Sequence, residues 1–409
     1  MRSWAGLGGT LLVACASLLT GCATNGPVSA SGRPISPAVL AAAEQRVTTE
    51  QVPAELRNDY LALYAEGREN QALYSVRLGL DALRTGHKDL AKRAFDDAIQ
   101  DVESLQAGAS QAQRAQGKFV REQEKWFKGE SYERAALYLY RGLLYFADQD
   151  FGNAAACFKR AEIQDITGED AKDFAGDWYS AEWALAFASL KHGYPADAHQ
   201  AFQRAEKFST RQGPVPPPQA ADNVLVVVEV GRGPQKYRSG EYGERLRFNE
   251  YVPRIQRVAI VQDNHELVRA AAAENLYVQA TTRGTRQVDY VLEGKAAFKE
   301  GTGVAAGFLG TGALIAAGQH SREGNIAAGV LGGLALISAV TSAATTPQAD
   351  IRAWDNLPHS IYLMSFKLPP GPAAFEVRGL GPADATVAKL VIQTETKQHQ
   401  GVQVVFVRL

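Results

Sequence analysis

Residues that could carry acid–base, nucleophilic or metal chemistry are scattered along this chain of 409 residues. No histidines fall at the H-E-x-x-H spacing or at another spacing typical of metal ligands, and no G-x-S-x-G motif occurs. Cys157 lies in the alanine-rich stretch "NAAACFKRA", which predicts a buried thiol rather than a nucleophile. We therefore expect a protein that is not an enzyme and that binds no cofactor or metal ion. A catalytic site assembled from distant residues is the alternative.

The amino terminus has the layout of a secretory signal peptide over residues 1–21. A basic segment, Met1–Trp4, precedes an apolar run, Ala5–Leu19, and small residues follow. The tetrapeptide "LTGC", which ends at Cys22, resembles the lipobox of bacterial lipoproteins. This resemblance implies cleavage before Cys22, attachment of lipid to its sulfur and acylation of the new amino terminus. An uncleaved membrane anchor that happens to contain a cysteine is the alternative.

The lipobox resemblance also implies where the protein resides. Ala23 follows the cysteine, and in lipoproteins of this type only an aspartate at that position retains the protein in the inner membrane. We therefore expect a protein anchored by lipid in the outer membrane and facing the periplasm. Residues 22–36 are rich in Gly, Ser and Pro and predict a flexible, lipidated tether.

Charge and cysteine usage narrow the class of protein further. The formal net charge is −1, so the chain lacks the basic character that nucleic-acid binding requires. Cys15 leaves with the signal peptide and Cys22 carries lipid, so Cys157 alone remains and the mature chain forms no internal disulfide. The length predicts two or three domains rather than one.

Residues 37–209 are rich in helix formers and repeat the pattern A-x-x-x-F-x-x-A three times. The pattern resembles the tetratricopeptide repeat (TPR), which implies stacked helical hairpins joined through small residues and phenylalanines. The phenylalanines are 63 and then 44 residues apart, so longer connections must separate the units. A helical bundle with alanine-rich seams, unrelated to TPR, is the alternative. The residues expected to pack the repeats are Gly79, Ala91, Phe95, Gly142, Ala154, Phe158, Ala198 and Phe202.

A proline-rich linker, residues 210–222, separates the helical region from a region of β-type patterns. We predict a mainly antiparallel β domain built from residues 223–300 and 350–409, with one short helix over 263–276 that Asp263 caps. A hairpin is expected at "PPGPA", similar to those of small β-sandwich domains of envelope proteins, and another across residues 397–400. The expected strands are 223–231, 254–262, 277–283, 287–294, 360–368 and the three apolar runs that follow.

Residues 301–346 interrupt this domain with ten glycines, eleven alanines and only two charges, Arg322 and Glu323. Two helices, 303–318 and 326–344, would be about 24 and 28 Å long, slightly shorter than the hydrocarbon core of a bilayer. Small residues four apart form a flat stripe that suits close helix packing, and the stretch resembles the glycine-zipper segments of envelope proteins. The zipper positions are Gly303, Gly307, Gly310, Gly329 and Gly333.

Three interpretations of this glycine-rich block remain open. It is a helical hairpin inserted in the outer membrane, a zipper between copies of the protein or against a partner, or a hairpin folded against its own sheet. Lengths and apolar content alone do not separate these possibilities, because the gain from insertion is only about 2–4 kcal/mol for the second helix.

The order of these features resembles a family of proteobacterial TPR-repeat lipoproteins, most closely in "PQADIRAWDNLPHSIYLMSFKLPPG" (347–371). The resemblance implies a multidomain α+β protein, with an amino-terminal TPR-like α-solenoid and a carboxy-terminal, mainly antiparallel β domain that carries a Gly/Ala-rich helical hairpin. It implies a role in the cell envelope and supplies no functional residues.

Our leading hypothesis is a lipid-anchored periplasmic scaffold or adaptor in cell-envelope assembly or maintenance. Its partners would be periplasmic or outer-membrane proteins bound through the TPR-like helices, and the zipper would join copies into a homo-oligomer or enter the membrane. The alternative is an oligomeric, membrane-embedded assembly or export component that uses the glycine-zipper hairpin.

Overall fold

The computed structural model describes residues 27–107, 125–166, 177–208, 213–282, 348–396 and 401–409. The predicted signal peptide, Cys22, the strand expected over 287–294 and all five zipper glycines lie outside the described residues. Within the described part of the chain, no helix is long and apolar enough to cross a membrane.

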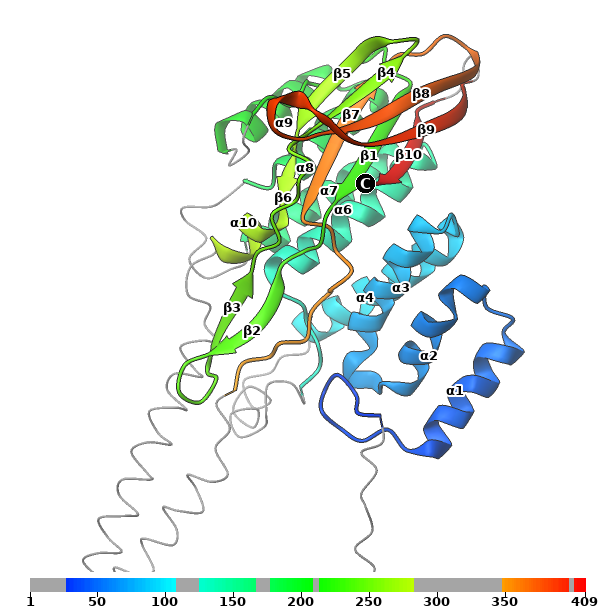
Figure 1. The fold of residues 1–409 in the computed structure, drawn as a ribbon, viewed down its shortest axis with the longest axis vertical. Helices are drawn as coiled ribbons and strands as arrows, with labels where there is room; N and C mark the ends of the chain where they lie inside the picture. Colours follow the sequence, from blue (N-terminus) through cyan, green and yellow to red (C-terminus); the bar gives the residue numbers. More distant parts are fainter. Residues whose placement is uncertain (1–26, 108–124, 167–176, 209–212, 283–347, 397–400) are drawn as a thin grey trace, which may run out of the picture.

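Helices make up the amino-terminal half of the described chain (Figure 1). Short turns join α3 to α4, α6 to α7 and α8 to α9, and each pair packs as a hairpin. Gly86 and Gly193 follow α3 and α8 with φ of 85° and 88°, the left-handed conformation that ends a helix most easily at glycine. The helices are α1 (Pro37–Thr49), α2 (Arg57–Ala65), α3 (Gln71–Arg84), α4 (Lys88–Ala107), α6 (Ser131–Ala147), α7 (Phe151–Ile166), α8 (Tyr179–His192) and α9 (Pro195–Phe208).

Strands and one short helix follow. They are β1 (Val224–Val230), β2 (Gln235–Ser239), β3 (Arg245–Asn249), β4 (Arg257–Gln262), β5 (His265–Ala271), β6 (Glu274–Asn275), α10 (Leu276–Thr281), β7 (Ser360–Phe366), β8 (Gly371–Leu380), β9 (Thr386–Thr396) and β10 (Gln403–Arg408). The fold is therefore mixed α+β, with helices first and mainly antiparallel sheets second, as predicted.

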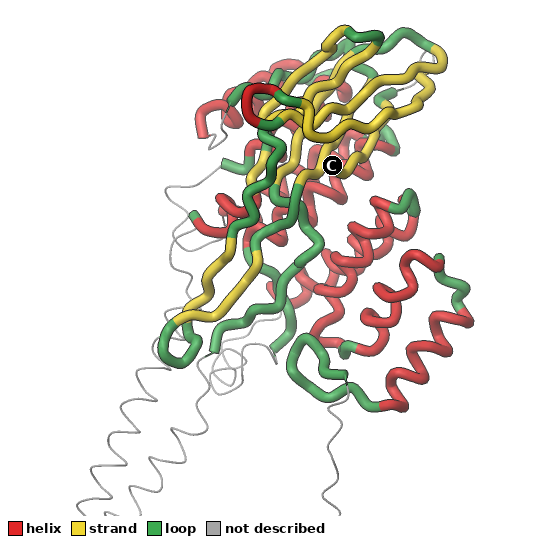
Figure 2. Tube along the Cα trace, in the orientation of Figure 1, coloured by secondary structure: helices red, strands yellow, loops and turns green. Residues whose placement is uncertain are grey.

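The described strands form two four-stranded sheets and a separate two-stranded ribbon, β2–β3. One sheet has the order β10-β1-β7-β6, and its β1–β10 pair is parallel. The other has the order β5-β4-β8-β9 and is antiparallel throughout. We call the first the middle sheet, because it lies between the helices and the second, outer sheet (Figures 1 and 2).

The middle position of this sheet explains the uninterrupted apolar run in β1. Glu229 on one face of β1 accepts hydrogen bonds from Tyr140 of α6 and Arg84 of α3. On the opposite face, Phe366 of β7 meets Phe375 of β8 with ring centroids 5.3 Å apart. Every residue of β1 is buried, as expected for a strand that is covered on both sides.

Two local predictions at residues 263–283 are wrong, because turn and cap residues override the alanine-rich composition. Residues 265–271 form strand β5 instead of a helix, and Asp263 and Asn264 form its hairpin turn with φ of 49° and 64°. Asp263 is thus a turn residue and not a helix cap. Residues 276–281 form α10 instead of a strand, because the Asn275 side chain accepts hydrogen bonds from the Tyr277 and Val278 amides.

Both predicted carboxy-terminal hairpins are also wrong. β7 belongs to the middle sheet and β8 to the outer sheet, so "PPGPA" connects two sheets. Likewise β9 pairs with β8, whereas β10 pairs in parallel with β1. Strands that are neighbours in the sequence do not pair here, because the chain passes from one sheet to the other between them. The strands predicted at 223–231, 254–262 and 360–368 are confirmed as β1, β4 and β7.

The described part of the predicted linker, residues 213–222, packs against both α8 and β5. Trp183 Nε1 donates to the Pro216 carbonyl at 2.8 Å, and the Ala271 amide donates to the Pro214 carbonyl at 2.9 Å. A single cluster of buried apolar side chains runs from the helices through both sheets. The helical and β regions therefore share one core.

Glycine and phenylalanine form the seams of two helical hairpins. A methyl group on Gly79 of α3 would lie 2.6 Å from the Phe95 ring of α4, and one on Gly142 of α6 would lie 2.5 Å from the Phe158 ring of α7. Both rings are fully buried. The close contact of each helix pair thus depends on the missing side chain.

We expect Gly79→Ala to lower the free energy of unfolding by about 1–3 kcal/mol in urea denaturation, because the buried Phe95 ring cannot move away. Gly152→Ala in α7 is the matched control, since the nearest atom to its new methyl is on the His192 side chain, 3.3 Å away. That control should gain up to about 1 kcal/mol of helix propensity. Equal changes in the free energy of unfolding for the two substitutions would contradict a close contact between Gly79 and the Phe95 ring.

Candidate partner-binding groove

A cavity of about 620 Å³ opens between the pair α1–α2 and the pair α3–α4. Side chains from all four helices line it, together with the turn that follows α1. The lining combines aliphatic, aromatic, cationic and acidic groups and includes Arg46, Glu50, Val52, Pro53, Tyr60, Leu63, Tyr64, Arg68, Leu78, Leu90, Arg93, Ala94 and Asp97. We call this cavity the groove.

The first wall of the groove is an aromatic surface held in place by charge. The Arg46 guanidinium lies 3.8 Å from the centroid of the Tyr64 ring, and Arg46 Nε donates to Glu50 Oε1 at 2.7 Å. The Tyr64 hydroxyl donates to the other Glu50 oxygen, and the Tyr60 ring packs on Tyr64 with centroids 5.7 Å apart. Burial raises the pKa of both tyrosines, so both hydroxyls stay neutral and able to donate.

The second wall is one face of α4, where Leu90, Arg93, Ala94 and Asp97 follow a helical spacing. Burial raises the pKa of the Asp97 carboxyl, the neighbouring Asp96 raises it further, and the positive charge of Arg93 opposes the shift. This wall therefore combines an apolar surface with one cation and one carboxyl group.

Two guanidinium groups of the groove have no ion-pair partner among the described residues: those of Arg68 and Arg93. The Arg68 guanidinium lies 5.9 Å from the centroid of the Trp126 ring, and its positive charge opposes the rise in the pKa of Asp101 that burial causes. An arginine presents several donors in a planar fork that suits a carboxylate. The groove is thus equipped to bind a ligand that has apolar and acidic groups.

None of the predicted repeat residues lines the groove. Ala91, Phe95, Ala154, Phe158 and Ala198 are buried in the helical seams, and Phe202 of α9 is half-buried against the same core. The residues that line the groove were missed from the sequence. Their only sequence signals are the four-residue interval between Tyr60 and Tyr64 and the helical spacing on α4.

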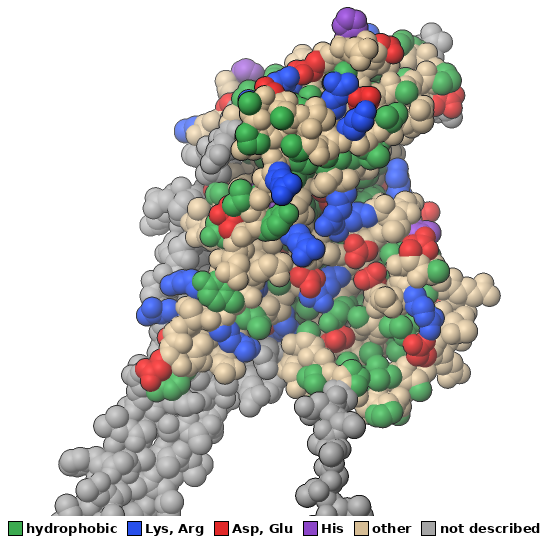
Figure 3. All heavy atoms as spheres, in the orientation of Figure 1, with side chains coloured by type: hydrophobic (Ala, Val, Ile, Leu, Met, Phe, Trp, Pro, Cys, Tyr) green, Lys and Arg blue, Asp and Glu red, His purple; other side chains and the backbone are tan. Residues whose placement is uncertain are grey.

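Charged pairs join the helices to the β region along their junction, where blue and red side chains gather in Figure 3. Arg84 of α3 pairs with Glu229 of β1 at 2.7 Å, and Arg77 of α3 pairs with Asp355 at 2.8 Å. These contacts fix the α3–α4 side of the groove on the β region.

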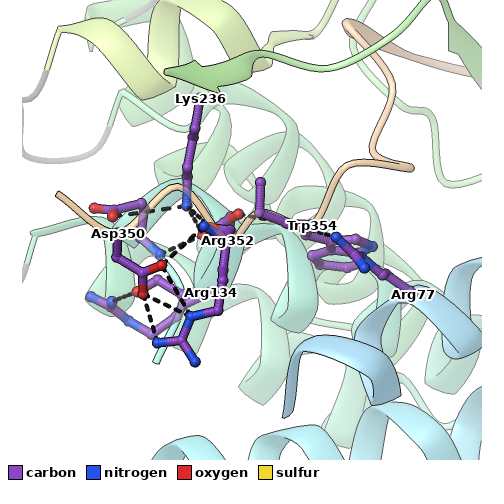
Figure 4. A network of polar contacts seen from close by, with 10 residues as sticks. Arg77, Arg134, Lys236, Asp350, Arg352 and Trp354 are labelled. Atoms are coloured by element: carbon purple, nitrogen blue, oxygen red, sulfur yellow. Dashed lines mark hydrogen bonds and ion pairs between the residues drawn. The ribbon is translucent and has the colours of Figure 1, made fainter. Parts of the chain in front are cut away.

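A buried polar cluster, the clamp, holds residues 348–359, which we call the return segment (Figure 4). Lys236 of β2 donates to Glu133 of α6 and to the Arg352 carbonyl, both at 2.9 Å. The other Glu133 oxygen accepts from the Trp354 amide at 2.8 Å. Arg352 makes a two-point contact with Asp350 and donates to Asn70 at the start of α3 at 2.8 Å. Four separate parts of the chain therefore meet at one point.

The clamp places the Trp354 ring in the core as a packing anchor. Its centroid lies 6.1 Å from that of Phe95 and 6.0 Å from that of Tyr140. The side chain is 2% exposed, so it cannot contact a ligand.

Five buried carboxyl groups from α7, from α8 and the residues before it, and from β6 interact with one another: Glu162, Asp165, Asp177, Glu182 and Glu274. Burial and the neighbouring negative charges raise the pKa of Glu162 well above its usual value, and burial raises the pKa of Glu274 to about 7. Glu274 accepts from Ser180 and Gln279, and Arg204 pairs with Glu182 at 2.6 Å. The sequence signal for Glu162 is its place four residues after the buried Phe158 on α7.

The described residues hold no group of three or more His, Cys, Asp or Glu that could bind a metal ion. His359 is buried, contacts Ser360 and has a pKa lowered by burial, and His87 contacts Glu55. Burial raises the pKa of Cys157 to about 11, so the thiol stays protonated near neutral pH. These groups contribute to packing and hydrogen bonding in the described part of the chain.

No protein-family model, curated protein or solved structure matches this chain. The geometry of the groove and its walls is therefore the basis for a functional proposal.

Removing one partner of the clamp should be costly. Lys236→Met leaves the Glu133 carboxylate buried without its cation, and we expect a loss of about 3–5 kcal/mol in the free energy of unfolding. The double variant Lys236→Met with Glu133→Gln should recover part of that loss, because no unpaired charge remains. Urea denaturation of the two single variants and the double variant gives the coupling energy between Lys236 and Glu133. If the losses of the two single variants simply add in the double variant, the clamp is contradicted.

Stability should fall as pH rises through neutrality. The pKa of Glu274 is about 7 in the folded protein against 4.5 in an unfolded chain, so between these values the folded state holds a proton that the unfolded state releases. The contribution is complete below pH 4.5 and is lost as pH rises through 7, and it amounts to about 3 kcal/mol.

Glu274→Gln should therefore flatten the dependence of the free energy of unfolding on pH between 5 and 8. Glu241→Gln, an exposed position in the β2–β3 turn, is the control and should leave the slope unchanged. An unaltered slope in Glu274→Gln would show that another group titrates.

Proposed function

We propose that this protein is a lipid-anchored adaptor of the cell envelope that holds a segment of a partner protein in the groove. The observation that carries the proposal is a pair of guanidiniums, those of Arg68 and Arg93, that form no ion pair within the described part of the chain and lie beside the Tyr60–Tyr64 surface. A volume of about 620 Å³ falls within the range of roughly 300–1,000 Å³ that is usual for binding pockets.

The partner segment should be extended and carry at least one carboxylate next to an apolar side chain. The carboxylate would accept hydrogen bonds from the two arginines, and the apolar group would lie on the tyrosine rings and on Leu63, Leu78 and Leu90. Periplasmic or outer-membrane proteins are the partners that fit the signal peptide and lipobox of the sequence.

TPR-like packing supports the same proposal. The Gly79–Phe95 and Gly142–Phe158 contacts join neighbouring helices in the manner expected of repeated helical hairpins. Stacked hairpins bind partners on surfaces that successive pairs build together, and in this proposal the groove between α1–α2 and α3–α4 takes that role.

The test is affinity capture from envelope extract with the full lipidated protein in detergent. The double variant Arg68→Ala with Arg93→Ala should recover the partner at least tenfold less well, because each hydrogen bond to a charged group contributes about 1.5–3 kcal/mol. Circular dichroism should show an unchanged fold, since neither arginine has an ion-pair partner among the described residues.

Arg57→Ala is the matched control, because Arg57 lies at the start of α2, pairs with Glu44 and does not line the groove. It should recover the partner as well as the unaltered protein does. A photoreactive residue in place of Tyr60 should crosslink to the same partner, and one in place of the exposed Val39 should not. Equal recovery by the Arg68/Arg93 variant would overturn the proposal.

A further inference from the structure

Strand β9 is a long edge strand with exposed apolar side chains. It ends the outer sheet, and within the described residues no strand pairs with its outer side. Val387, Leu390 and Val391 are 46%, 43% and 53% exposed. An open edge of this length offers its backbone groups to another strand, and proteins usually cover or interrupt such edges.

The two faces of β9 differ in character. Leu390 and Ile392 lie opposite Val377 and the buried Phe375 of β8, so they belong to the apolar face of the outer sheet. Lys389, Val391, Gln393 and Glu395 alternate with them on the exposed face. A strand that added to β9 would have to match an apolar face on one side and, on the other, a row of polar side chains with Val391 among them.

The charges on the exposed face have no complement within the described chain. Lys389 lies opposite Arg378, whose guanidinium already binds Glu376 at 2.6 Å. Glu395 lies opposite Pro372 at the other end of the strand. The strand thus carries a cation at one end and an anion at the other, six residues apart, and neither has an ion-pair partner among the described residues.

This arrangement is self-complementary. In an antiparallel pair of identical strands, residues on the same face must meet, so the two-fold axis passes through a residue and not between two residues. An axis at Ile392 places Lys389 of each copy opposite Glu395 of the other, and Ile392 opposite Ile392 on the apolar face. An axis at Val391 would instead leave each Lys389 opposite Gln393.

We propose that β9 pairs in antiparallel register with β9 of a second copy of this chain, about a two-fold axis at Ile392. The two four-stranded outer sheets then join into one continuous sheet, with two Lys389–Glu395 pairs on its exposed face. This inference is independent of the groove and of the glycine-rich block.

Charge reversal tests the register with the full chain in detergent, by sedimentation over a range of concentrations. The unaltered protein should be a dimer. Lys389→Glu and Glu395→Lys each set like charges opposite one another twice, and each should raise the dissociation constant at least tenfold. The double reversal restores both pairs and should return the constant to within about threefold of the original.

Both residues are exposed, so the far-ultraviolet circular dichroism of the variants should not change, which separates loss of pairing from loss of fold. A monomeric unaltered protein, or an oligomer that does not respond to either single reversal, would overturn the proposal. The second result would indicate that another surface, such as the glycine-rich block, joins the copies.

Cysteine crosslinking locates the axis directly. Two Ile392→Cys residues would face one another at about 4.5–5.5 Å between Cα atoms, within the range for a disulfide. Val387→Cys is the control, because the two copies of residue 387 would lie at opposite ends of the pair. The unaltered chain serves as the background for its native cysteines. Crosslinking at Val387 and not at Ile392 would exclude this register.

Discussion

The buried ion pair between Lys236 and Glu133 is the constraint on which the arrangement of this protein depends. Both side chains are almost fully buried, and a buried charge is tolerated only when its partners satisfy it. Glu133 receives hydrogen bonds from Lys236, from the Trp354 amide and from the Glu130 amide. The first residues of α6, the β2–β3 ribbon and the return segment are thereby joined where the chain re-enters the β region.

This constraint also determines which surface of the helices stays open. The clamp holds Trp354 between Phe95 and Tyr140, and the middle sheet covers the face of α3 and α6 that carries Arg84 and Tyr140. In a free-standing stack of hairpins that face would be a binding surface. Here it is core, so the open cavity between helices lies farther toward the amino terminus, against α1 and α2.

The elements that could be predicted are those whose residue pattern follows from burial of the strand or from spacing along one helix. The apolar run of β1 and the seams at Gly79 and Gly142 follow from burial and helical spacing alone. Residues 263–283 were predicted wrongly, because their alanines favour helix, whereas the turn at Asp263–Asn264 and the cap at Asn275 decide the outcome. Single short-range hydrogen bonds outweigh composition over such short elements.

Long-range contacts account for what the sequence could not predict. The groove combines Arg46 of α1 with Arg93 of α4, and the buried carboxyl cluster brings Glu162 of α7 to Glu274 of β6. On its own helix or strand, each of these residues looks like an ordinary polar position. Its role depends on neighbours that come from distant parts of the chain. The same holds for β9, whose pairing with β8 rather than β10 defines its open edge.

The groove and the β9 edge belong to different layers of the molecule, since one lies among the first four helices and the other in the outer sheet (Figure 1). Occupation of one surface therefore leaves the other open. A pair joined through β9 would carry two grooves in fixed relation, and a partner with two matching segments would bind the second without a further loss of translational freedom. Modest affinity in each groove would then suffice for a stable assembly.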